Sequence, residues 1–257
     1  MLTLEEIKKE YSETIFGRNP RGALVEYLQY EMLDSLFKQK DSAKLSFIGG
    51  TAVRIVYGGN RFSEDLDFDN FGLSFTDFQK VLKMSIEDMR NKGFKIEVRF
   101  VKKKAYHAYV KFPDLLFENN LSKHVDEKIL VRVDAVRKKK IIQPKIFVLD
   151  GFSVYKKILV NPMAVILSQK IIAILERKRT KGRDFFDVSF LLSRVDPDYK
   201  YLKEYGIKNR QDLKNRLLEK ISKTDLKSLA KDVEPFLINP DEKERVSGFR
   251  EYIEQKL

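Results

Sequence analysis

Three aspartates stand at alternate positions in the stretch "RFSEDLDFDN", residues 61–70. Asp65, Asp67 and Asp69 are separated by Leu66 and Phe68, so an extended strand places the carboxylates on one face and the apolar side chains on the other. Like charges this close repel one another. The stretch therefore predicts a strand with one face in a core, and something must stabilise the acidic face.

Three interpretations of the acidic row make different demands. A calcium-binding loop needs glycine at its sixth position and glutamate at its twelfth, where this chain has Asn70 and Thr76, so that interpretation fails. A solvated edge strand with outward carboxylates stays open. A magnesium site fits best, because Mg²⁺ binds one or two carboxylates together with phosphate oxygens and water.

A glycine turn precedes the acidic row. In "FIGGTAVRIVYGG" a short strand runs into Gly49 and Gly50 and then into an amphipathic helix. Glycine lets the backbone approach a ligand closely, and the N–H groups of a helix start can bind a phosphate. Taken alone, such a turn is more often structural, and no Gly-Lys-Ser/Thr follows as in a P-loop. Followed within one helix by Asp-x-Asp, it indicates nucleotidyl transfer, in which metal ions bridge a triphosphate and activate a hydroxyl.

A polymerase-type site usually needs a third carboxylate from a neighbouring strand. In "ILVRVDAV", residues 129–136, one face is wholly apolar, and Asp134 lies on the other face with Arg132. Asp134 is therefore the candidate third metal ligand. A surface pairing of Asp134 with Arg132 explains the pattern nearly as well and stays open.

Charged groups also stand out in the second half of the chain. Lys170 lies within "PMAVILSQKIIAILERK", a helix that is apolar almost all round, and an ammonium there is costly unless it reaches solvent or meets an anion such as a triphosphate. Replacing Lys170 by alanine should relieve that cost and leave the unfolding midpoint close to that of the wild type. In "RDFFDVSFLL", Asp184 and Asp187 share one helical face, although Asp184 also favours the helix dipole.

Two kinds of structure must position these residues. Residues 1–150 are predicted to form N-terminal helices and a mixed α/β core, because helical periods alternate there with strands rich in β-branched and aromatic residues. Residues 151–257 are predicted to form a helical region that completes the active-site cleft. The two histidines, His107 and His124, are too isolated for a metal site and are assigned structural or surface roles.

The composition narrows the partners. The 257 residues carry 50 Lys and Arg against 38 Asp and Glu, and the net charge of +12 favours RNA or DNA, although solubility explains part of it. Basic runs at residues 101–106, 136–145 and 176–183 are candidates to follow an RNA backbone. Cysteine is absent, no run of about 18 apolar residues predicts a membrane span, and the charged N-terminus is unlike a signal peptide, so a cytoplasmic location is expected.

Two blocks of the sequence resemble a known family. "GGTAVRIVYGGNRFSEDLDFD" and "SQKIIAILERKRTKGRDFFDVSFLL" are similar to the signature blocks of the AbiEii-like nucleotidyltransferases, the toxins of type IV-like toxin–antitoxin and abortive-infection systems. The resemblance implies a DNA polymerase β-like core of the α+β class, Mg²⁺ or Mn²⁺ as cofactor, an NTP substrate and a cognate antitoxin protein. It also implies an RNA acceptor, which in characterised relatives is the 3′ end of tRNA.

The resemblance also assigns roles. Asp65 and Asp67 match the metal-binding Asp-x-Asp, Gly49 and Gly50 the phosphate turn, and Ser63 a small hydroxyl residue at the edge of the site. Arg61, beside it, is expected to contact a phosphate. Lys170 is expected to bind the triphosphate, Asp184 to be a functional acid and Asp187 to support it. Asp69 is expected to be an N-cap or turn residue. Transfer of NMP to a protein side chain, or nucleic-acid binding without catalysis, remain rival functions.

Overall fold

The chain divides into two compact units in the computed structural model, which describes residues 1–139 and 142–257. Unit 1 comprises Met1–Ala52 and Phe62–Asn161, and unit 2 comprises Val53–Arg61 and Pro162–Leu257. The basic run at residues 136–145 lies partly outside the described residues, at Lys140 and Ile141. The expected boundary at residue 150 falls inside a hairpin, because the strand that follows Gly151 pairs back onto the strand before it.

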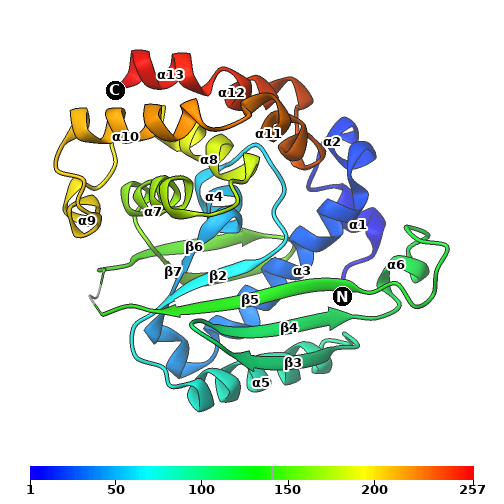
Figure 1. The fold of residues 1–257 in the computed structure, drawn as a ribbon. Helices are drawn as coiled ribbons and strands as arrows, with labels where there is room; N and C mark the ends of the chain where they lie inside the picture. The colour runs from blue at the N-terminus through cyan, green and yellow to red at the C-terminus, as the bar shows by residue number, and fades with distance from the viewer. Residues whose placement is uncertain (140–141) are drawn as a thin grey trace. The chain divides into compact units, whose positions relative to one another are not determined.

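Unit 1 is built on a mixed sheet, as the sequence predicts (Figure 1). The sheet has seven strands, and the last of them, β7 (Val154–Val160), falls within the range that was expected to be helical. The strand order is β3-β4-β5-β2-β1-β7-β6, and the pairs β2–β5 and β1–β7 are parallel. The Asp-x-Asp strand β2 and the Asp134 strand β5, which were expected to be neighbours, lie side by side in the middle of the sheet, and β1 lies on the other side of β2. The strands are β1 (Leu45–Ile48), β2 (Leu66–Asn70), β3 (Glu97–Lys102), β4 (Tyr106–Phe112), β5 (Ile129–Arg137), β6 (Lys145–Gly151) and β7 (Val154–Val160).

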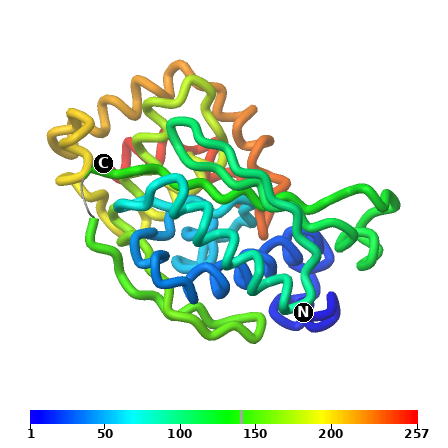
Figure 2. Tube along the Cα trace, turned by 90° about the horizontal axis from the view of Figure 1, so that it is seen from below, coloured from blue at the N-terminus to red at the C-terminus, as the bar shows by residue number. Residues whose placement is uncertain are grey.

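Two helices of unit 1 pack on the apolar face of the sheet and form the core with it. Helices α3 (Pro20–Phe37) and α5 (Phe75–Asn91) contact each other, and both can be followed by colour in Figure 2. Met32 of α3 and Ile86 of α5 lie around Leu66, Val110 and Val133, which come from β2, β4 and β5. The apolar face of the Asp-x-Asp strand is therefore the core face. Because side chains alternate along a strand, Asp67 and Asp134 lie on the opposite face.

Side-chain caps explain where these helices begin. Asn19 accepts a hydrogen bond from the N–H of Gly22 at 2.7 Å and Pro20 follows it, so "GRNPRG" ends α2 (Glu13–Arg18) and starts α3. Ser74 forms a capping box with Asp77 at the start of α5. The other helices of unit 1 are α1 (Leu4–Lys8), α6 (Leu115–Glu118) and the 3-10 helix η1 (Lys40–Lys44).

Helix α4 (Gly49–Tyr57) begins in unit 1 and continues into unit 2, which is otherwise helical. The most buried helix of unit 2 is α8 (Gly182–Leu192), because α7, α11, α12 and α13 all contact it. No helix among the described residues is long and apolar enough to cross a membrane. The remaining helices of unit 2 are α7 (Met163–Glu176), α9 (Tyr199–Leu202), η2 (Lys203–Tyr205), α10 (Arg210–Ser222), α11 (Leu226–Val233), η3 (Glu234–Phe236), η4 (Pro240–Lys243), α12 (Glu244–Ser247) and α13 (Phe249–Lys256).

Candidate active site

Asp67 and Asp134 are register partners on the neighbouring parallel strands β2 and β5. The row continues on both sides, since Asp134 pairs with His107 of β4 and Asp67 pairs with Ile48 of β1. Paired residues of adjacent strands point to the same face of a sheet. The carboxylates therefore share one face in the middle of the sheet, and the solvated edge strand considered from the sequence is ruled out.

Gly49 directly follows Ile48 and packs against Asp67. Its φ is +81°, a backbone conformation that residues other than glycine rarely adopt. A Cβ at this position would overlap the carboxylate of Asp67 and lie 2.8 Å from the Cβ of that residue. Gly50, which is buried, follows in the first turn of α4. The expected proximity of the glycine turn to the carboxylates is confirmed, and glycine is required so that the helix can start beside Asp67.

Thr51 connects the same helix start to Asp65. Its hydroxyl donates a hydrogen bond to the backbone carbonyl of Asp65, and its side chain is fully buried. Asp65 itself precedes β2 and is partly exposed. The first turn of α4 thus contacts both members of the Asp-x-Asp pair, Asp67 through Gly49 and Asp65 through Thr51.

Arg132 brings Asp65 and Asp134 together. Its Nη2 donates to Oδ2 of Asp65 at 2.8 Å, and its Nε lies 2.9 Å from Oδ2 of Asp134 without the alignment of a hydrogen bond. The Asp134–Arg132 pairing that the sequence left open is therefore present. Partial burial lowers the pKa of Arg132, but Asp65, Asp134 and Asp67 outweigh it, so the pKa is raised.

His107 contacts the other oxygen of the Asp134 carboxyl group. Its Nδ1 lies 2.7 Å from Oδ1 of Asp134, and only 19% of its side chain is exposed. An Nδ1–H that donates to a carboxylate fixes the imidazole and orients its partner. His107 therefore has a role at the site that the sequence did not predict, because its partner is set by strand register.

The carboxylate set suits a hard cation in its chemistry. Asp65 and Asp134 already converge on one positive charge, the guanidinium of Arg132, and the electrostatic effect of Asp67 reaches the same group. Oxygen donors of this kind are what Mg²⁺ and Mn²⁺ bind. With the side chains as they stand, no three His, Asp or Glu residues in the described ranges are arranged to hold a metal together.

Asp69 is a buried strand residue, which corrects the expectation of an N-cap or turn. It is 0% exposed and accepts a hydrogen bond from Nδ2 of Asn161 at 2.7 Å, with Nζ of Lys138 at 3.5 Å. The strand continues to Asn70, and that residue makes the turn, since its Oδ1 accepts from the N–H groups of Gly72 and Leu73. The turn therefore begins at Asn70, one residue later than expected.

Ser63 lies in the loop between α4 and β2. It is partly exposed, and its carbonyl accepts a hydrogen bond from Nε2 of Gln29 at 2.9 Å. This contact from α3 fixes the backbone of the loop two residues before Asp65.

The remaining predicted residues form a buried charge cluster within unit 2. Nε and Nη2 of Arg61 donate to the two carboxylate oxygens of Asp187, each at 2.7 Å. Nζ of Lys170 lies 2.8 Å from Asp187 and 3.1 Å from Asp184. Arg177, which is 43% exposed, contacts the other oxygen of Asp184 at 2.6 Å. Three cations thus surround two carboxylates.

The electrostatics of this cluster favour the charged forms. Burial lowers the pKa of Lys170, but Asp187 and Asp184 outweigh burial and the repulsion from Arg61, so the pKa is raised. Burial raises the pKa of Asp187, but Arg61 and Lys170 outweigh it, so the pKa is lowered. Each group is charged because of its neighbours.

Two expectations change in view of these contacts. Lys170 is not a lone ammonium in an apolar helix, because two carboxylates of α8 accompany it. Arg61 is 3% exposed and is engaged by Asp187, so in this arrangement it does not present its charge to a phosphate. The predicted proximity of Asp184 and Asp187 is confirmed by their shared contact with Lys170. That the helical region, with Lys170 and Asp184, completes the active-site cleft stays a prediction.

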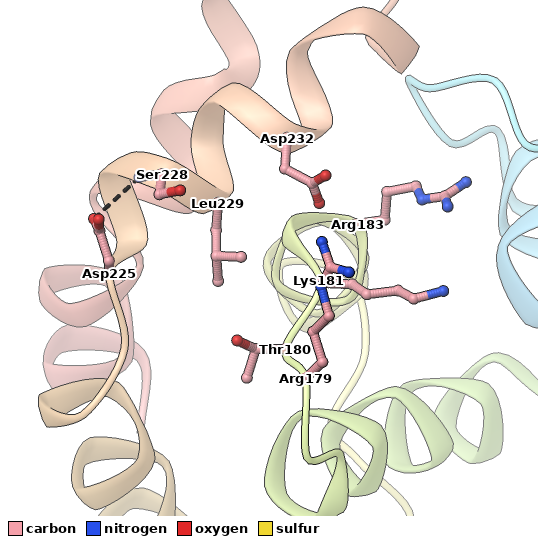
Figure 3. A pocket seen from close by; sticks show the side chains of 8 residues that line it. All are labelled: Arg179, Thr180, Lys181, Arg183, Asp225, Ser228, Leu229 and Asp232. Carbon is pink, nitrogen blue, oxygen red and sulfur yellow. Dashed lines mark hydrogen bonds between the residues drawn. The ribbon is translucent and has the colours of Figure 1, made fainter.

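The basic run at residues 176–183 borders a pocket of unit 2 of about 540 Å³ (Figure 3). Gly182 allows the close packing of its walls, because a Cβ there would overlap the carbonyl oxygen of Leu229. Asp232 accepts a hydrogen bond from the N–H of Gly182 at 3.2 Å. The pocket is lined by Arg179, Thr180, Lys181, Arg183, Asp225, Ser228, Leu229 and Asp232.

Comparisons with known proteins agree with this architecture. The profile of the family described as "Nucleotidyl transferase AbiEii toxin, Type IV TA system" matches residues 31–255. The crystal structure of JHP933 from Helicobacter pylori is 20% identical with a TM-score of 0.55, and the match covers 92% of this chain and 93% of that one. A candidate nucleotidyltransferase from H. pylori is 20% identical with a TM-score of 0.58, covering 96% and 97%.

At this identity the two structures establish the fold alone, and no curated protein matches the chain. The family profile, in contrast, spans most of the sequence, including both signature blocks and every candidate residue described above. The chain therefore belongs to the AbiEii family of nucleotidyl transferase toxins of type IV toxin–antitoxin systems.

Proposed function

We propose that this enzyme transfers NMP from an NTP to an RNA acceptor, the 3′ end of tRNA, in a reaction that requires Mg²⁺ or Mn²⁺. The observation that carries the proposal is the pairing of Asp67 with Asp134 across β2 and β5, beside the glycine turn that starts α4. Carboxylates next to a helix start bring a cation site and a phosphate site together. That combination is what phosphoryl chemistry on a triphosphate needs.

In the proposed reaction the residues of the site divide metal binding, proton transfer and phosphate binding among them. Asp65, Asp67 and Asp134 would hold the metal, which when bound would neutralise the developing charge on the triphosphate. The acceptor hydroxyl oxygen forms a bond to the α-phosphorus, the bond from that phosphorus to the bridging oxygen breaks, and pyrophosphate leaves. The hydroxyl proton passes to Asp134, which His107 orients. Gly49 and Gly50 would let backbone N–H groups approach the phosphates.

Lys170 and Asp184 are proposed to serve the nucleotide through the charge cluster of unit 2. The cluster has three cations for two carboxylates, so it retains positive charge that a triphosphate would neutralise. Arg177 is its most exposed member. In this proposal Arg61 and Asp187 position Lys170 and do not touch the nucleotide, because both are buried against each other.

An RNA acceptor is supported by charge. The net charge of +12 and the basic side chains of Arg179, Lys181 and Arg183 beside the pocket of Figure 3 suit a phosphate backbone. A cognate antitoxin is the partner that a toxin of this family requires, and we propose the cytoplasm, where NTPs and tRNA are found, as the location of the reaction.

The decisive experiment incubates the protein with each of the four α-labelled NTPs, Mg²⁺ or Mn²⁺, and a mixture of total RNA and cell protein. We expect label on tRNA, loss of label with a chelator, and no label with the Asp67→Asn variant. The Asp150→Asn variant is the matched control, since Asp150 is an exposed strand aspartate of β6. Label on protein would establish transfer to a side chain instead, and RNA binding without label would establish a non-catalytic protein.

A further inference from the structure

Arg132 occupies the oxygens that a metal would need. One carboxylate oxygen of Asp65 and one of Asp134 lie within 2.8 Å and 2.9 Å of its guanidinium. The second oxygen of Asp134 is already held by His107. A divalent cation that binds both carboxylates therefore meets a resident positive charge on the same side of the sheet.

The placement of Arg132 follows from the strand, since it stands two residues before Asp134 on the same face of β5. Its side chain is 37% exposed, so the guanidinium can leave the carboxylates without being buried elsewhere. Without Arg132, the carboxylates on this face of the sheet would repel one another. Arg132 thus stabilises the folded site when no other cation is there.

We propose that Arg132 is a built-in counter-cation of the carboxylate site, which holds Asp65 and Asp134 until a divalent cation binds and must then release at least one of them. The inference rests on the proposed function insofar as it takes these carboxylates to be metal ligands. Arg132 weakens the binding of metal alone. An arriving triphosphate offers the released guanidinium another anion, so metal and nucleotide favour each other's binding.

The test is a titration of the full-length, nucleotide-free protein with Mn²⁺ and with Mg²⁺, followed by calorimetry and by the unfolding midpoint. The Arg132→Met variant removes the charge and keeps an unbranched chain. We expect a lower midpoint without metal, metal binding about tenfold tighter than in the wild type, and a larger metal-dependent rise of the midpoint. Arg137→Met, an exposed arginine of the same strand, is the matched control and should behave as the wild type.

A second arm adds a non-hydrolysable NTP analogue. The analogue should tighten metal binding more in the wild type than in Arg132→Met, because only the wild type has a guanidinium to displace. Arg132→Lys keeps one charge but cannot bridge two carboxylates as a guanidinium does, so its metal affinity should fall between the two. If Arg132→Met does not fold, Arg132→Lys decides the question.

Metal binding that is equal or weaker in the folded Arg132 variants overturns the inference, and so does a failure of both wild type and variants to bind metal. These results are separate from catalysis. A protein that transfers no nucleotide but shows the tighter binding keeps the inference and loses the proposed reaction. One that transfers nucleotide but shows no change in the variants loses the inference alone.

Discussion

Arg61 and Asp187 lie 126 positions apart in the sequence and form a bidentate ion pair in the interior of unit 2. Their side chains are 3% and 1% exposed. The loop that carries Arg61 leads directly to the Asp-x-Asp strand, so this pair fixes one end of the loop to α8. Breaking this pair leaves Asp187 with Lys170 as its remaining counter-charge in a buried environment, so the pair should contribute to stability.

We therefore expect Arg61→Met to lower the free energy of unfolding by about 1.5–3 kcal/mol, because Asp187 loses two hydrogen bonds from a charged donor but keeps Lys170 as a counter-charge. Asp187→Asn should cost a similar amount. In chemical denaturation, the double variant Arg61→Met/Asp187→Leu should be less destabilised than the sum of the single variants. Strict additivity would contradict a direct energetic coupling between the two residues.

The pH dependence of stability should report the same cluster. The pKa of Asp187 is lowered in the folded protein, so its contribution is complete above the ordinary aspartate pKa of about 3.9 and is lost as pH falls through the folded-state value. The pKa of Lys170 is raised, so its contribution is complete below about 10.4 and is lost as pH rises through the folded-state value.

Thermal unfolding measured from neutral pH down past the ordinary aspartate pKa, and up past the ordinary lysine pKa, checks this prediction. Asp187→Asn should lose less stability than the wild type on going from neutral to acidic pH, whereas the exposed Asp150→Asn should follow the wild type. Asp34 and Asp88, whose pKa values are also lowered, remain in both variants, so the difference between the variants isolates Asp187. An identical acid limb for wild type and Asp187→Asn would contradict the lowered pKa.

Lys170→Ala is expected to destabilise the protein, in contrast to what the sequence alone suggests. The lysine accompanies Asp184 and Asp187, so its removal leaves two buried carboxylates with less positive charge. A loss of about 1.5–3 kcal/mol follows, because Arg61 and Arg177 still compensate the two carboxylates. Lys170→Met and Lys170→Arg separate volume from charge, and the arginine variant should recover most of the unfolding free energy. An unchanged unfolding midpoint for Lys170→Ala would show that the contacts of Lys170 with Asp184 and Asp187 do not stabilise the protein.

How far the sequence could predict this site depends on the range of each interaction. The face shared by Asp67 and Asp134 was predictable, because alternation along a strand is local and the apolar partners of each residue fix the core side. Strand register decides that His107 meets Asp134, and no local pattern in "AYHAYVKF" encodes register. The isolated His107 therefore gave no signal, although it lies beside Asp134 on the same face of the sheet.

The charge cluster shows the same limit at longer range. The spacing of Asp184 and Asp187 on one helical face predicted that they act together, and the apolar helix predicted that Lys170 needs either solvent or an anion. That the anions are these two aspartates depends on the packing of α7 against α8. That Arg61 joins them depends on long-range packing, since Arg61 belongs to unit 2 and Ser63, two positions later, belongs to unit 1.

Gly49→Ala should disrupt the site locally. The φ of +81° is strained for alanine by about 1–3 kcal/mol, and the new methyl group also overlaps Asp67. Gly58→Ala is the matched control, since Gly58 has a φ of +69° and open space around it, so that variant carries the backbone strain without the overlap. We expect both variants to lose stability in thermal unfolding, but only Gly49→Ala to lose metal binding and transfer. Equal loss of transfer in both would attribute it to strain alone.

Metal should stabilise the folded protein through Asp65 and Asp67. A ligand that binds only the folded state raises the free energy of unfolding by about 2.7 kcal/mol at a hundred times its dissociation constant. The double variant Asp65→Asn/Asp67→Asn keeps the side-chain volumes and removes both charges. It should therefore show no rise of the unfolding midpoint with Mn²⁺ or Mg²⁺, transfer no nucleotide, and lose toxicity when expressed in cells.

The midpoint of that double variant without metal is informative in its own right. Removing the repulsion between the carboxylates stabilises the protein, whereas losing the Arg132–Asp65 contact, which is more than one-third exposed on the arginine side, costs at most about 1 kcal/mol. The two effects oppose each other, so the midpoint should stay close to that of the wild type, and Asp150→Asn supplies the control. Asparagine keeps the volume of each side chain and removes only its charge. A double variant that keeps the metal-dependent rise or the transfer would therefore show that the metal is held elsewhere.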